Sequence, residues 1–205
     1  MRNLIVFDTE TNGLSSKCSI LSISAIRILN NKYDSEYTRY YYPVEPFDRE
    51  SVKINGLDYN SITKLRNTEK YPRYFKDDFM SFYNFIKECT HFVGHNIAFD
   101  MRFIKPIELS HVFCTMNANK DVLKLKKRDN TIKQPKLQEA ADYYGIDFDS
   151  NDLHGSSYDT RLTLKVFIAM NKHPISRPLV ANFLNKNGIP PILKNSTYLF
   201  SFENN

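Results

Sequence analysis

The chain has 205 residues, 41% of them hydrophobic, and a formal net charge of +5. This length predicts one domain with a sizeable core. No apolar stretch approaches the roughly 20 residues of a membrane helix, which argues against a membrane protein. Three cysteines without a CxxC pair argue against a zinc site or a disulfide framework, so we expect reduced thiols in the cytoplasm. The positive charge fits nucleic acid as a partner and an ordinary basic protein equally well.

The first 45 residues are predicted to form an antiparallel meander. Residues 4–8 are an apolar run typical of a buried strand, residues 20–28 form a second strand, and the Tyr- and Thr-rich residues 36–44 form a third. Asn30 and Asn31 favour a turn between the last two strands.

The pattern then becomes helical. Apolar residues at spacings of three and four predict a helix over 75–86, and a short buried strand follows at 92–94. We expect further helices from Phe99 to Ile104, over 137–144 and over 157–171. Strands followed by alternating strands and helices indicate an α/β fold with a mixed sheet flanked by helices.

Residues 172–205 are interpreted as a C-terminal extension to a domain of residues 1–171, because four prolines break them into short pieces. The extension either packs on the domain or binds a partner. Packing is favoured because its apolar side chains would otherwise be exposed; they are Leu179, Val180, Phe183, Leu184, Leu199 and Phe200.

Asp8 and Glu10 stand two residues apart at the end of the first strand, so their carboxylates point to one face. Two like charges at that distance favour a bound cation between them. Mg²⁺ and Mn²⁺ prefer such oxygen ligands. The simpler interpretation is a strand that ends in solvent, and the D-x-E pair alone favours it.

Two further acids and a histidine favour the metal site over a strand that ends in solvent. Asp100 lies within apolar sequence, where an unpaired charge is costly, although Arg102 or Lys105 could pair with it. Asp159 lies in the first turn of the last helix, where an acid also suits the helix dipole. His154 precedes it in a Gly-Ser loop. The unperturbed pKa of a histidine suits a general base near neutral pH, although most loop histidines are merely solvated. Four carboxylates can hold two metal ions, and together with His154 they predict phosphodiester hydrolysis.

The three segments that carry these residues resemble the 3′–5′ exonucleases of the DEDD superfamily. They are FDTETNGL at 7–14, VGHNIAFD at 93–100 and HGSSYD at 154–159, in the order of the family. The H-x4-D spacing is that of the histidine-bearing branch, which includes the proofreading subunit of the bacterial replicative polymerase. The resemblance covers about residues 1–171 and implies a ribonuclease H-like fold with a five-stranded mixed sheet. It also implies two Mg²⁺ or Mn²⁺ ions on Asp8, Glu10, Asp100 and Asp159, with His154 as the general base.

The same resemblance implies the substrate contacts. Thr9 and Glu10 would hold the terminal 3′-OH, and Leu14 would wedge against the last base. Ile54 and Asn55 lie in a segment that lines the nucleotide pocket of the family, where Asn55 replaces the usual histidine. Asn96 and Phe99 would complete the pocket, although core packing is an equally good interpretation for Ile54 and Phe99.

The residues between 120 and 136 include seven basic and two acidic side chains. This charge fits contact with a phosphate backbone or simply a solvated face.

From the acidic motifs and the family resemblance we expect a 3′–5′ exonuclease that releases nucleoside 5′-monophosphates from single-stranded or frayed 3′ ends, with DNA favoured. Two alternatives are an RNA-trimming enzyme and a binding module for a polymerase or repair partner.

Overall fold

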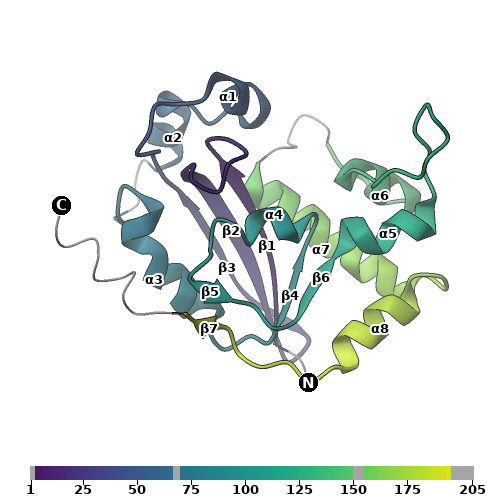
Figure 1. Cartoon of the computed structure of the whole chain (residues 1–205). Helices are drawn as coiled ribbons and strands as arrows, with labels where there is room; N and C mark the ends of the chain where they lie inside the picture. Colours follow the sequence, from purple (N-terminus) through teal and green to yellow (C-terminus); the bar gives the residue numbers. More distant parts are fainter. Residues whose placement is uncertain (1–2, 67–69, 150–154, 195–205) are drawn as a thin grey trace.

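The computed structural model describes residues 3–66, 70–149 and 155–194. Five strands form a mixed sheet in the order β3-β2-β1-β4-β6 (Figure 1). The strands are β1 (Leu4–Thr11), β2 (Ile20–Leu29), β3 (Lys32–Tyr40), β4 (His91–Gly94) and β6 (Val112–Cys114). β1 to β3 are antiparallel neighbours, whereas β4 runs parallel to β1 and β6 runs parallel to β4. The expected five-stranded mixed sheet is therefore confirmed.

The helices lie on both faces of this sheet and beside its ends. They are α1 (Arg49–Asn55), α2 (Tyr59–Leu65), α3 (Phe75–Ile86), α4 (Ile97–Asp100), α5 (Thr115–Leu123), α6 (Leu137–Tyr143), α7 (Ser156–Lys172) and α8 (Arg177–Asn185). The expected helices at 75–86, 137–144 and 157–171 correspond to α3, α6 and α7. No described helix combines the length and apolar character needed to cross a bilayer.

Side chains of β1 alternate between two hydrophobic cores. Ile5 and Phe7 belong to the core that includes Phe79 and Phe82 of α3. Leu4 and Val6 face the other way, into the core that includes Leu162, Val166 and Phe167 of α7. This period of two explains why the whole run is apolar, since both faces of a central strand are covered by helices.

Two predicted elements have different bounds in the structure. β3 spans Lys32–Tyr40 rather than 36–44, because Asn30 and Asn31, with φ of 52° and 64°, form the tight turn by themselves. Pro43, which has no N–H to donate, follows the strand. The helix expected through Ile104 is the single turn α4; beyond Asp100 the chain continues in turns, with the N–H of Ile107 donating to the carbonyl of Ile104.

The described part of the predicted extension packs on the rest of the chain. Val180 and Phe183 of α8 are buried in the core on the α7 side. A two-residue strand, β7 (Ile192–Leu193), pairs antiparallel with β5 (Ile107–Glu108). Leu199 and Phe200 lie outside the described residues, and the domain boundary at 172 stays a prediction.

Candidate active site

Three carboxylates meet at the carboxyl end of the central strand. Asp8 and Glu10 come from β1, and Asp159 comes from the first turn of α7. One carboxylate oxygen of each lies within 4.8 Å of those of the other two. Glu10 and Asp159, 149 positions apart in sequence, thus belong to one cluster.

Small polar side chains allow α7 to begin this close to the sheet. Ser22 and Ser24 of β2 are fully buried, and the Oγ of each lies 2.9 Å from the Oγ of Ser156, the first residue of the helix. The Thr160 hydroxyl donates to the carbonyl of Ser24 at 3.3 Å. These bonds place Asp159 opposite β1, and its charge is also favoured by the helix dipole.

Asp100 reaches the same site from α4. It is 3% exposed, and its Oδ1 accepts two hydrogen bonds from Thr9, one from the backbone N–H at 3.0 Å and one from the hydroxyl at 2.7 Å. Among the described residues it has no ion pair with Arg102 or Lys105 within 4.0 Å, so a simple salt bridge does not explain its burial. Asp100 lines the cavity of the other three acids but stands outside their 4.8 Å group.

Backbone geometry holds α4 against the sheet. Asn96 precedes the helix with a φ of 67°, a left-handed conformation that asparagine tolerates. An added Cβ on Gly94 would lie 2.9 Å from Cβ of Ile97 and 3.2 Å from the carbonyl oxygen of Phe7. Only glycine therefore lets β4 turn into α4 so close to β1.

Burial raises the pKa values of three of these acids, and repulsion from neighbouring carboxylates adds to the shift at Asp8 and Glu10. Burial, and then repulsion from Asp100, Glu10 and Asp159, raises the pKa of Asp8 well above its usual range. Burial and repulsion from Asp159 and Asp100 do the same to the pKa of Glu10, against a hydrogen bond from Asn55. Burial raises the pKa of Asp100 to about 7, although the bonds from Thr9 oppose the shift. A cluster of hard oxygen ligands with unfavourable mutual repulsion fits divalent cations such as Mg²⁺ or Mn²⁺.

A cavity of about 490 Å³ contains the four carboxylates. Of the predicted substrate contacts, Thr9, Asn96 and Phe99 line it. Asn55 lies beside it, donating from Nδ2 to the carbonyl of Thr11 at 3.3 Å. Leu14 and Ile54 are 79% and 61% exposed and do not line this cavity, so they are not core residues. His154 lies outside the described residues.

One wall of the cavity was absent from the sequence prediction. It is formed by Met116 of α5 and by residues leading into and along α6, namely Gln134, Pro135, Lys136, Leu137 and Gln138. His95 joins this wall to the sheet, with Nδ1 3.0 Å from the hydroxyl of Thr115 and Nε2 3.1 Å from the carbonyl of Pro135. Burial lowers the pKa of His95 to about 4, so the ring is neutral near pH 7. His95 lies in the segment VGHNIAFD and Lys136 in the basic segment 120–136, but nothing in the sequence marked Met116, Gln134, Pro135, Leu137 or Gln138 as neighbours of the acids.

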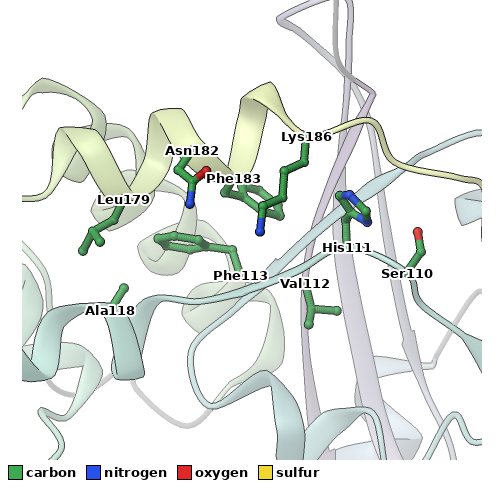
Figure 2. Close-up of a pocket in the computed structure, with 9 residues that line it drawn as sticks. All are labelled: Ser110, His111, Val112, Phe113, Ala118, Leu179, Asn182, Phe183 and Lys186. Carbon is green, nitrogen blue, oxygen red and sulfur yellow. The ribbon is translucent and has the colours of Figure 1, made fainter.

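A second cavity, of about 390 Å³, lies between β6 and α8 (Figure 2). The rings of Phe113 and Phe183, with centroids 5.2 Å apart, line it together with the larger polar side chains of His111, Asn182 and Lys186. No carboxylate lines it. The acidic cavity is therefore the one with the ligands for metal-assisted hydrolysis.

This mixed sheet, with carboxylates gathered at the end of its central strand, defines a hydrolase of the class that acts with divalent metals. Residues 5–167 match the family described as Exonuclease (RNase_T), and the chain belongs to that family.

Two kinds of relative resemble the chain in sequence. It is 26% identical to the DNA polymerase III subunit epsilon of Buchnera aphidicola subsp. Schizaphis graminum, over 96% of this chain and 86% of that protein. It is 27% identical to the DNA polymerase III PolC-type of Staphylococcus epidermidis, over 81% of this chain but only 11% of that much longer protein.

Solved structures share the fold. Exonuclease I of E. coli in complex with a dT13 oligonucleotide superimposes with a TM-score of 0.70 at 13% identity, over 98% of this chain and 46% of that one. Exonuclease X in complex with a 5′ overhanging duplex DNA gives a TM-score of 0.59 at 18% identity, over 82% and 92% of the two chains.

Proposed function

We propose that the chain is a metal-dependent 3′–5′ exonuclease that releases nucleoside 5′-monophosphates from single-stranded or frayed 3′ ends. The observation that carries the proposal is the meeting of Asp8, Glu10 and Asp159 within 4.8 Å, in a cavity that also contains Asp100. Repulsion among these acids makes the site suited to cations rather than to an uncompensated anionic substrate.

Each residue of the site has a separate role in the proposed reaction. Asp8, Glu10, Asp100 and Asp159 would hold two Mg²⁺ or Mn²⁺ ions, which supply activation of the attacking water and stabilisation of the leaving 3′ oxygen. Thr9 orients Asp100, whereas Asn96 and Phe99 receive the terminal nucleotide. As the water attacks the terminal phosphorus, the bond to the neighbouring 3′ oxygen breaks and His154 takes the water's proton.

DNA is the favoured substrate. Support comes from the polymerase relatives and from the two structural neighbours whose complexes contain DNA. RNA remains the alternative, because discrimination against a 2′-OH needs only one or two contacts near the pocket.

The test uses 5′-labelled single-stranded DNA and RNA of the same sequence, each with Mg²⁺, with Mn²⁺ or with EDTA. A ladder of shortened labelled products that needs the metal is expected, with DNA shortened faster. Release of the label as a mononucleotide at the start would show the opposite polarity, and no metal-dependent shortening of either strand would refute the proposal.

A His154 variant tests the general base. His154→Ala should slow cleavage by about 10²–10⁴-fold, the usual contribution of acid–base catalysis. It should also remove the acidic limb of the pH–rate profile, a readout that a merely structural role would not change.

A polymerase is the proposed partner, and the cytoplasm the proposed location. The epsilon relative is by name a polymerase subunit, and the three cysteines, Cys18, Cys89 and Cys114, form no disulfide. Co-elution of the chain with its host's replicative polymerase would support the partnership. Truncation after Lys194, which keeps α8 and β7, would then test the last eleven residues as the docking segment: nuclease activity should persist while co-elution is lost.

A further inference from the structure

We propose that a basic β-hairpin beside the acidic cavity binds the phosphate backbone of the strand being degraded, upstream of its 3′ end. The hairpin spans residues 125–133 between α5 and α6, where Figure 1 shows a projecting loop. This inference rests on the proposed function and adds a second, separate binding surface to it.

The hairpin is a defined structure. Lys126 and Ile132 form an antiparallel bridge, and the N–H of Lys133 donates to the carbonyl of Leu125 at 2.9 Å. At its tip Asn130 adopts a φ of 64°, and the N–H of Lys127 donates to the carbonyl of Thr131 at 2.9 Å.

The net charge of the protein is concentrated in residues 120–136, the segment that contains the hairpin. Seven of the 28 basic residues and two of the 23 acidic residues lie between 120 and 136, so the rest of the chain carries 21 of each sign. Local folding also occupies the acid at the tip, because Asp129 accepts hydrogen bonds from the backbone N–H and the hydroxyl of Thr131, at 3.0 and 2.6 Å.

Three of these cations are available to a ligand. Lys126, Lys127 and Arg128 are exposed, and within the described residues none has a carboxylate within 4.0 Å. Lys133 differs, since its Nζ lies 2.5 Å from a carboxylate oxygen of Glu139. Lys126, Lys127 and Arg128, the tip cations, repel one another, and an anionic partner with repeated charges relieves this repulsion. A phosphate backbone is such a partner.

The base of the hairpin is a wall of the acidic cavity. Gln134, Pro135 and Lys136 line that cavity, and Pro135 is held by His95. The six residue steps from Arg128 to Gln134 span at most about 20 Å. At a rise of about 3.4 Å per nucleotide in a stacked strand, the tip cations reach phosphates within about six nucleotides of the 3′ end.

The test compares two triple variants that each remove three positive charges. The first is Lys126→Gln, Lys127→Gln and Arg128→Gln. The control is Lys32→Gln, Lys87→Gln and Lys172→Gln, three exposed cations at the start of β3, just after α3 and at the end of α7, away from the acids. Binding of single-stranded oligonucleotides of 2 to 12 nucleotides is measured by anisotropy in an Asp8→Asn background, over a range of salt.

The hairpin variant should lose at least tenfold in affinity for 12-mers relative to the control. The slope of log K against log salt should fall by about 2, as expected for three lost contacts to a single strand. The affinity difference should grow with length up to about six nucleotides and then level off. Equal affinities and slopes for the two variants at every length would overturn the proposal.

Cleavage of the p-nitrophenyl ester of thymidine 5′-monophosphate by the protein with intact Asp8 tests the active site separately. This probe has no upstream phosphates. No hydrolysis of it would count against the proposed function, while the binding data would still decide the role of the hairpin.

Discussion

The hydroxyl of Thr9 donates a hydrogen bond to Oδ1 of Asp100 at 2.7 Å, between residues 91 positions apart in sequence. Thr9 lies between Asp8 and Glu10 on β1. The strand that supplies two proposed metal ligands therefore also holds a third, and the two bonds from Thr9 favour its charged form.

Thr9→Val should weaken the site without removing a ligand. Hydrogen bonds to charged groups are worth about 1.5–3 kcal/mol, so we expect at least a tenfold loss in Mn²⁺ affinity, measured by calorimetry, and a higher Mn²⁺ requirement for cleavage. Thr9→Ser keeps the hydroxyl and should restore both. Equal Mn²⁺ affinity in the valine variant and the wild type would contradict this role.

Asp8→Asn should abolish cleavage and leave the fold intact. Because it removes one charge from a cluster of like charges, the melting temperature of the metal-free protein should rise or stay constant. Glu88→Gln, an exposed acid before β4, is the control and should change neither cleavage nor melting. A large fall in the melting temperature of the asparagine variant would mean that Asp8 has a structural role instead.

The metal-free protein should lose stability as pH rises from about 5 to about 7, a range above that in which carboxyls with lowered pKa values, such as those of Glu45 and Glu139, lose their protons. Asp100 has a folded-state pKa of about 7 against an ordinary value near 4, so over this range the folded chain binds more protons than the unfolded chain. The free energy of unfolding then decreases with pH, and Asp8 and Glu10 act in the same direction. Urea denaturation with EDTA measures this trend, which Mn²⁺ should reverse by binding the ionised acids. Stability that rises with pH in EDTA would refute the raised pKa values.

Gly94→Ala should disturb α4. The added Cβ would lie 2.9 Å from Cβ of Ile97, closer than packed atoms come, and in tight contact at 3.2 Å with the carbonyl oxygen of Phe7; overpacking of this kind costs about 1–3 kcal/mol. Since α4 carries Asp100, Mn²⁺ affinity should fall even under conditions where the variant is fully folded. Thermal melting and calorimetry measure the two effects, and an unchanged melting temperature would show that the β4–α4 turn can adapt.

The sequence predicted the elements whose patterns depend on burial by the sheet. The run at 4–8 and the helix at 75–86 were found because their apolar spacing is set by the two cores. It did not predict β6, where Val112 is 41% exposed and the strand has only three residues.

In the site, too, the residues that were predicted are those with a distinctive local sequence pattern. Asp8, Glu10, Asp100 and Asp159 were selected because acids next to apolar runs are rare. The wall formed by Met116 and residues 134–138 was not predicted, because its place beside the acids depends on the bond between His95 and Pro135. Residues 134–138 carry no motif of the kind that marked the acids, so nothing in them indicated a contact with His95, 40 positions before Pro135.

The acidic cluster is shared between the first strand and the first turn of the last long helix. A chain still being synthesised, which exposes its N-terminal elements first, holds Asp8 and Glu10 long before Asp159 exists. Such a chain has two of the three clustered carboxylates, so we expect cleavage to begin only when α7 docks on β1. A nascent chain that lacks Asp159 is therefore expected to leave the nucleic acids around it uncut.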